Sequence, residues 1–240
     1  MTPLRLRPFS LQKPRLAAML LASLALAACD DDDDPTAPVA TAQLRVVHAS
    51  PDAPNVDVLV DGAAALTNVP FKAASDYLSV PSGARNLKVR AAGTTTVVID
   101  QNATVVGGRA YTVLATGPVA SIAPLVLEDD LTNPASGNVR LRLVHASPTA
   151  GNVDIYVTAP TANLDTTTPT LSNVAFRAAS SYLEVPAGTY RVRITPAGTK
   201  TVAIDVNNVA LTAGQIRTAV AVDAPGGGAP LGAILLADEN

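Results

Sequence analysis

The residue types that could carry chemistry gather in one short stretch of the chain. His48, Ser50, Asp52 and Asp57 follow one another there. One hypothesis is a metal site built from His48, Asp52 and Asp57. Zinc usually takes three or four protein ligands, with more than one His or Cys among them, and the stretch offers a single His. We therefore favour a structural role, in which the imidazole hydrogen-bonds turn backbone groups or Asp57.

The same stretch also contains the residue types of a hydrolase triad. Ser50, however, lies two residues from His48 on one short segment, and no nucleophile elbow or oxyanion turn accompanies it. We expect no catalytic residue, no cofactor and no enzymatic activity.

An internal duplication repeats this stretch. LRVVHASPDAPNVD at residues 44–57 recurs as LRLVHASPTAGNVD at residues 141–154. His145 and Asp154 take the places of His48 and Asp57, whereas Thr149 replaces Asp52. The candidate ligand or turn site therefore comprises these residues: His48, Asp52, Asp57, His145 and Asp154.

A second block is duplicated as well. Residues 68–78 match residues 173–183, and the offset grows from 97 to 105, which places an insertion within residues 158–170. Phe71, Tyr77 and their counterparts Phe176 and Tyr182 are expected in the core or at a sheet edge. The alternative is that the tyrosines border a ligand groove with Lys72 or Arg177.

Both copies have the pattern of β-strands. Apolar residues alternate with others in residues 44–48 and 56–61, and further short runs follow at 76–80, 85–91, 95–100, 109–116 and 122–127. Turn residues separate the runs. This spacing predicts an all-β chain with two tandem Ig-like antiparallel β-sandwich modules of about seven strands each. We expect modules at residues 43–130 and 138–240, with a linker over residues 129–137.

The N-terminal region has the features of an export signal. Basic residues without acids precede an apolar run at residues 16–28, which is too short to span a bilayer. Leu26-Ala27-Ala28-Cys29 resembles the lipobox of bacterial lipoproteins. That resemblance implies a signal peptide at residues 1–28 and a lipidated Cys29 that attaches the protein to a membrane. Residues 29–42 contain five consecutive aspartates and are expected to form an acidic tether.

Composition limits the remaining possibilities. The formal net charge is −3, and no basic cluster suggests a nucleic-acid partner. Cys29 is the single cysteine, so the chain can form no internal disulfide. The chain has no Trp, and its aliphatic residues predict an aliphatic core.

The duplicated strand-turn-strand motif resembles the domain-of-unknown-function family numbered 4397. This resemblance covers nearly all of residues 43–240 as two copies, and implies an extracytoplasmic β-sandwich without established chemistry.

We therefore expect a non-enzymatic lipoprotein of the cell envelope, on the periplasmic face or the cell surface. Its role would be binding, adhesion or spacing, with an envelope protein, the cell wall or an extracellular ligand as partner. Loops 49–55, 146–152 and 158–170 are the expected contact regions. The alternative is an envelope sensor that binds a small ligand or metal through the two His-Ala-Ser-Pro turns.

Overall fold

β-Strands dominate residues 39–239, the part of the chain that the computed structural model describes. Cys29, the signal peptide and most of the acidic tether lie outside these residues. Module 1 contains β1 (Thr41–Ala49), β2 (Val56–Val60), β3 (Ala63–Val69), β4 (Leu78–Pro81), β5 (Gly83–Ala91), β6 (Val97–Val105), β7 (Ala110–Thr116) and β8 (Ala123–Asp129). A short 3-10 turn, η1 (Val119–Ser121), precedes β8.

Module 2 repeats this order. It contains β9 (Asn138–His145), β10 (Val153–Thr158), β11 (Leu171–Val174), β12 (Leu183–Pro186), β13 (Gly188–Pro196), β14 (Ile204–Leu211), β15 (Ile216–Val222) and β16 (Gly232–Glu239). The prediction of an all-β chain with two sandwich modules is confirmed. No expected run corresponds to β3, because its first residues are alanines, which have low β-propensity.

Each module is a sandwich of two four-stranded sheets. The outer sheets have the orders β3-β2-β5-β6 and β11-β10-β13-β14, and the inner sheets have the orders β4-β1-β7-β8 and β12-β9-β15-β16. Most neighbours are antiparallel, as expected. Each inner sheet also contains one parallel pair that the sequence did not indicate, β1 with β7 and β9 with β15.

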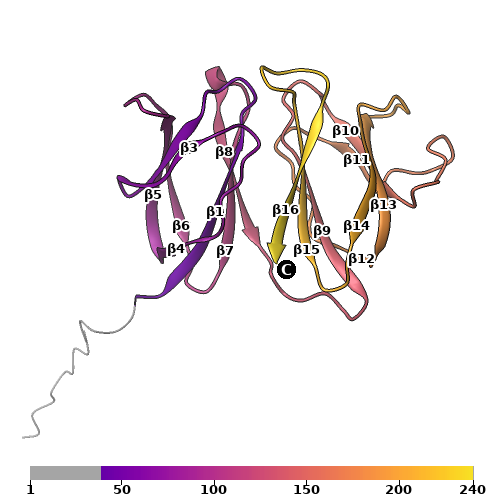
Figure 1. Cartoon of the computed structure of the whole chain (residues 1–240), viewed down its shortest axis with the longest axis horizontal. Coiled ribbons are helices and arrows are strands. Elements are labelled where there is room, and N and C mark those ends of the chain that lie inside the picture. The colour runs from indigo at the N-terminus through magenta and orange to yellow at the C-terminus, as the bar shows by residue number, and fades with distance from the viewer. Residues whose placement is uncertain (1–38, 240) are drawn as a thin grey trace, which may run out of the picture. The chain divides into compact units, whose positions relative to one another are not determined.

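The inner sheets are buried on both faces. From β1, Leu44 and Val46 point into the core of module 1, whereas Val47 and Ala49 enter a separate apolar cluster. This cluster combines residues of both modules, including Leu114 of β7 and Val220 of β15. The two inner sheets therefore pack face to face, and Figure 1 shows them side by side between the outer sheets.

The strand directions determine at which end of the sandwich each loop lies. β1 and β7 run in parallel, and β9 and β15 do the same, so the turns after β1 and β9 lie at the ends of the sheets where β8 and β16 begin. The turns concerned are residues 50–55 and 146–152. The inserted loop leaves β10 at the opposite end of module 2, because β10 starts at the turn after β9 and runs back. The loop then folds over the outer sheet, where the carbonyl oxygens of Ala162 and Thr167 accept from Arg193 and Lys200.

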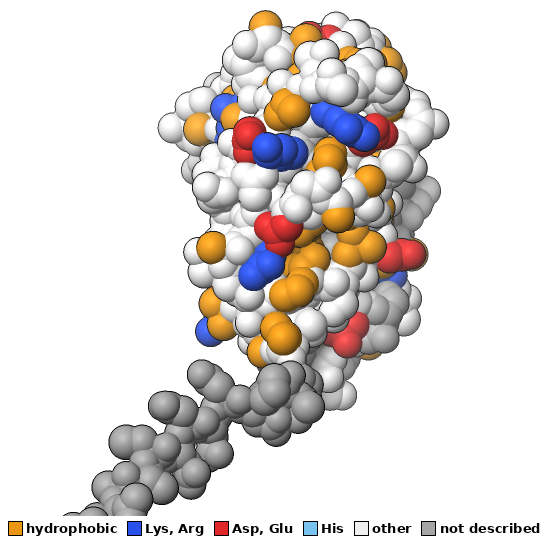
Figure 2. Space-filling view, turned by 90° about the vertical axis from the view of Figure 1, so that its left-hand side faces the viewer, with side chains coloured by type: hydrophobic (Ala, Val, Ile, Leu, Met, Phe, Trp, Pro, Cys, Tyr) orange, Lys and Arg blue, Asp and Glu red, His pale blue; other side chains and the backbone are white. Residues whose placement is uncertain are grey.

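The outer surface of module 1 is mixed in character. On the face shown in Figure 2, basic side chains lie beside acidic ones and apolar side chains lie between them. The outer sheet carries such ion pairs in Lys88–Asp100 and Arg85–Asp61. Among the described residues, no helix is long and apolar enough to cross a membrane.

Candidate functional site

In each of the two His-Ala-Ser-Pro turns, the imidazole ring is buried and lies within hydrogen-bonding distance of backbone groups of the same turn. His48 is fully buried, its Nε2 lies 3.1 Å from the carbonyl oxygen of Pro54, and its Nδ1 lies 3.3 Å from the backbone amide nitrogen of Ser50. The Ser50 amide can only donate, so Nδ1 accepts and Nε2 carries the proton that it donates to Pro54. Both ring nitrogens are therefore engaged within the turn.

Module 2 repeats this arrangement. His145 is fully buried, with Nε2 at 2.7 Å from the Gly151 carbonyl oxygen and Nδ1 at 3.4 Å from the Ser147 amide nitrogen. The rings of Phe71 and Phe176 form T-shaped pairs with the two imidazoles, at 6.0 and 6.3 Å between centroids. The equivalent histidines thus brace equivalent turns.

The residues of the supposed triad do not come together. The hydroxyl of Ser50 donates to the carbonyl oxygen of Gly117 at 2.6 Å rather than to an imidazole. Asp57 accepts from the backbone amides of Asn68 at 2.9 Å and Gly93 at 3.3 Å. The stretch therefore holds turns together and provides no nucleophile–base pair.

The candidate aspartates also serve as turn acceptors. Asp52 accepts from the amide of Val119 at 2.8 Å, which ties the first turn to η1. Asp154 accepts from the amides of Asn173 and Gly198, both at 2.8 Å. Within residues 39–239 no group of three or more His, Cys, Asp or Glu side chains is placed to hold a metal ion.

Two reciprocal ion pairs join the modules between the inner sheets. Arg45 of module 1 reaches Asp238 of module 2 at 2.6 Å, and Arg142 of module 2 reaches Asp129 of module 1. All four side chains are almost fully buried. We call these four residues the Arg–Asp clasp. The expected linker began at Asp129, and that residue is instead the buried end of β8.

Each carboxylate of the clasp is fully hydrogen-bonded. Asp129 accepts from the hydroxyls of Tyr77 at 2.7 Å and Thr112 at 2.6 Å. Asp238 accepts from Tyr182 at 2.8 Å and Thr218 at 2.6 Å. Such additional donors offset part of the cost of removing the charges from water.

Tyr77 and Tyr182 belong to this interface, where their hydroxyls donate to Asp129 and Asp238. The guanidiniums of Arg45 and Arg142 lie over their rings, at 4.8 and 4.7 Å from the centroids. Burial raises the pKa of both phenols well above the ordinary range, and the neighbouring carboxylates act in the same direction. Both tyrosines are therefore un-ionised donors.

Further contacts secure the other end of the interface. Arg177 of module 2 donates to the hydroxyl of Thr116 at 2.9 Å and to the carbonyl oxygen of Ser121 at 3.0 Å. Gly117 has φ +90°, and a Cβ there would lie 2.9 Å from the Arg177 guanidinium. The amide of Gly226 donates to the carbonyl oxygen of Pro51 at 2.7 Å. Arg177 and the bond between Gly226 and Pro51 thus connect the modules.

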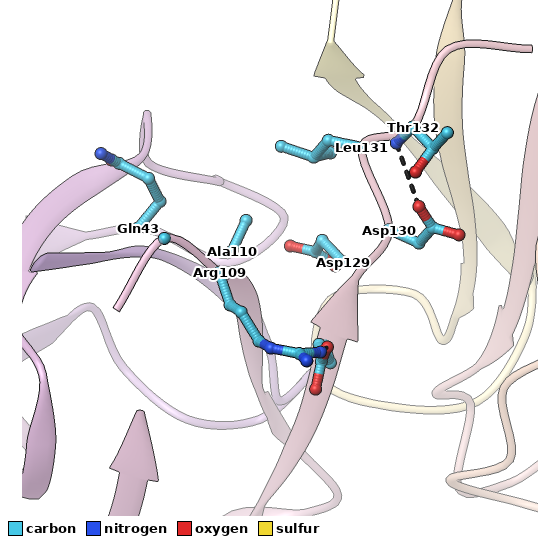
Figure 3. A pocket seen from close by; sticks show the side chains of 9 residues that line it. Gln43, Arg109, Ala110, Asp129, Asp130, Leu131 and Thr132 are labelled. Carbon is cyan, nitrogen blue, oxygen red and sulfur yellow. Dashed lines mark hydrogen bonds and ion pairs between the residues drawn. The ribbon is translucent and has the colours of Figure 1, made fainter. Parts of the chain in front are cut away.

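A cavity of about 600 Å³ lies beside the clasp at the start of the linker. Figure 3 shows Leu131 and Asp130 on one side of it and Arg109 on the other. Arg109 is paired with Glu128, and the guanidinium of Arg140 holds the pKa of Asp130 well below its usual range. The charged groups that line this cavity are thus already paired, which leaves few charged groups to bind a ligand selectively.

Comparison with known proteins assigns the chain to a family. Residues 42–156 and 158–240 match the model described as Domain of unknown function (DUF4397). The chain belongs to the DUF4397 family. The two DUF4397 segments meet inside β10. In the structure, by contrast, the boundary between the two modules lies between Asp129, where β8 ends, and Asn138, where β9 begins.

Two solved structures share a distant likeness with this DUF4397 chain. A proposed adhesin from Bacteroides ovatus has 12% identity and a TM-score of 0.24, over 83% of this chain and 96% of that one. A proposed cell-adhesion protein from Bacteroides fragilis has 10% identity and a TM-score of 0.21, over 82% and 98%. Both scores are too low to show a shared fold. No curated protein matches the chain.

The buried histidines predict acid sensitivity. Burial lowers the pKa of His48 and His145, and their carbonyl partners oppose this only in part. Below about pH 6.5 the two histidines bind protons in the unfolded chain more readily than in the folded chain. The free energy of unfolding should therefore be level above this pH and fall as the pH drops below it. Urea unfolding at pH 8, 7, 6 and 5 measures the loss.

His48→Gln is the variant for this test. It should cost about 2 kcal/mol at pH 8 through the lost hydrogen bonds, yet lose less stability than wild type between pH 7 and pH 5. Asp57 does not disturb this comparison. Backbone donation from Asn68 lowers the pKa of Asp57 from 3.8, so the stability that this carboxylate contributes is lost only near or below that pH. An equal acid loss in both proteins would contradict the assignment.

A double-mutant cycle tests the Arg–Asp clasp. Arg45→Met or Asp238→Asn alone should reduce the free energy of unfolding by about 3–5 kcal/mol, because each leaves a buried charge without its partner. The double variant should lose clearly less than the sum. The exposed pair Lys88–Asp100 is the control, and its removal should cost less than about 1 kcal/mol. Additive losses at Arg45 and Asp238 would show that the pair is not coupled.

Proposed function

We propose that this DUF4397 chain is a non-enzymatic, lipid-anchored protein of the cell envelope whose two modules act as one binding or spacing unit. The observation that carries this proposal is the Arg–Asp clasp. Two modules on a free linker would move independently, whereas buried reciprocal charges permit one arrangement. A unit of fixed geometry suits a protein that holds a partner at a set distance from a membrane.

The direction of the chain supports this role. The described chain begins at Val39, which is 69% exposed, and enters β1 at the end opposite to loop 50–55. A tether attached through Cys29 would leave the two His-Ala-Ser-Pro turns at the end away from the anchor. We propose another envelope protein, the cell wall or an extracellular ligand as the partner.

The internal use of the catalytic-type residues favours binding over turnover. His48 and His145 have both ring nitrogens engaged in their turns, and Ser50 donates to a backbone carbonyl. These bonds would have to break before any of these groups reached a substrate or a metal.

The anchor makes a direct prediction. Cells producing the full chain with a tag after Asn240 should hold that tag in the membrane fraction, and Cys29→Ala should move most of it to a soluble fraction. Two or more acyl chains account for the difference, because one chain alone binds only marginally. Fractionation followed by immunoblotting measures the distribution.

Protease treatment of the same intact cells then distinguishes the two faces. Loss of the tag, with a periplasmic marker preserved, would place the modules on the cell surface, and survival would place them inside. Membrane retention of a Cys29→Ala chain whose signal peptide N-terminal sequencing shows to be removed would contradict the lipid anchor.

A further inference from the structure

The interface between the two modules is built from equivalent residues. Arg45 and Arg142 occupy the same place in the duplication, and the strand pairings make Asp129 equivalent to Asp238. Each module thus contributes one Arg and one Asp to the Arg–Asp clasp, and each Arg reaches the Asp of the other module. Such an interface is isologous, because both partners use the same surface patch.

The surroundings of the clasp repeat this correspondence. The hydroxyls that donate to the two carboxylates come from equivalent residues, Tyr77 with Thr112 and Tyr182 with Thr218. The aliphatic cluster between the inner sheets contains further equivalent pairs, which are Val47 with Val144, Ala49 with Ala146, Leu114 with Val220, and Leu127 with Leu236. We call this side of each inner sheet, with its clasp residues and its cluster residues, the clasp face. The clasp faces of the two modules are thus complementary copies of one surface.

Contacts at the rim favour the pairing of unlike modules. Arg177 of module 2 donates to the hydroxyl of Thr116, and the counterpart of Thr116 in module 2 is Val222, which has no acceptor in its side chain. The counterpart of Gly117 is Asp223, and a Cβ at the place of Gly117 would lie 2.9 Å from the Arg177 guanidinium. Two copies of module 2 would therefore lose these bonds, and two copies of module 1 would lack the arginine. Module 1 fits module 2 best.

The linker over residues 130–137 is bound to module 2 alone. Arg140 donates to the carbonyl oxygen of Thr132 at 2.7 Å, and the amide of Ala135 donates to the carboxylate of Glu184 at 2.9 Å. Among the residues that the structure describes, no hydrogen bond joins the linker to module 1. At full extension the linker spans about 28 Å, similar to the diameter of a small domain. It is therefore long enough to connect module 1 to a neighbouring chain.

We propose that the clasp face binds a second copy of this chain, in that two chains exchange modules and module 1 of each pairs with module 2 of the other. Each resulting unit keeps the contacts of the clasp, the cluster and the rim, and only the path of the linkers changes. A short linker holds the modules of one chain at an effective concentration of about 1 mM. Chains that fold side by side at a similar concentration would therefore exchange. This inference goes beyond the proposed function and does not depend on the anchor.

Complementary charge inversions in full-length chains, handled in mild detergent, test the exchange. Arg45→Asp with Asp129→Arg inverts the clasp of module 1 in one chain, and Arg142→Asp with Asp238→Arg inverts that of module 2 in another. The two modules of either chain then present like charges to each other. Exchanged modules from the two chains present opposite charges at every position of the clasp.

The two chains carry different tags and are refolded separately or together at about 0.1 mM, below the effective concentration within one chain. Tandem affinity purification and light scattering measure the dimer that contains both tags. The mixture should form at least about tenfold more dimer than either chain alone. Lys88→Asp with Asp100→Lys inverts an exposed ion pair of module 1 and is the matched control, which should stay monomeric.

Two results would overturn the proposal. One is a mixture that stays monomeric although circular dichroism shows that both chains have folded β-structure. The other is an equal amount of dimer from either chain alone, because that result would show that like modules pair.

Wild-type chains give a second test that needs no variant. Differently tagged chains that are unfolded in urea and refolded together at about 1 mM should form dimers with both tags, whereas refolding at about 0.01 mM should give monomers. Chains that are folded separately and then mixed should exchange far more slowly, because opening of the interface exposes buried charges. Monomers alone at both concentrations would contradict the exchange.

Discussion

Two arginines buried between the inner sheets constrain the rest of the molecule. A guanidinium in an apolar interior requires a carboxylate partner, and Arg45 and Arg142 each find theirs in the other module. The sheets can therefore stack in one register only. The aliphatic residues around Val47 of module 1 then pack against those around Val220 of module 2. Both faces of each inner sheet are thereby removed from water.

The clasp also determines which surfaces remain available. Arg45 and Arg142 also donate to the backbone carbonyl oxygens of Ala237 and Glu128. These bonds cover part of the exposed edges of β16 and β8. The first imidazole-braced turn is tied to the β15–β16 loop of module 2, because the amide of Gly226 donates to the carbonyl oxygen of Pro51.

Local pattern predicted much of the fold, and long-range pairing accounts for what it missed. The duplication and the alternation of apolar residues were sufficient for two sandwiches, but they indicated no partner for Arg45 or Val47. The nearly continuous apolar runs in β1, β7 and β15 were the available signal of burial on both faces. Asp238 lies far from Arg45 in sequence, so no local pattern connects them. The bonds of His48 to its own turn, by contrast, were among the predicted alternatives.

Differential scanning calorimetry of the full-length protein tests the central claim most directly, which is that the clasp makes two modules one body. The account predicts one cooperative transition whose calorimetric and van't Hoff enthalpies agree. Two separate transitions, or a calorimetric enthalpy about twice the van't Hoff value, would show that the modules unfold independently and would contradict it.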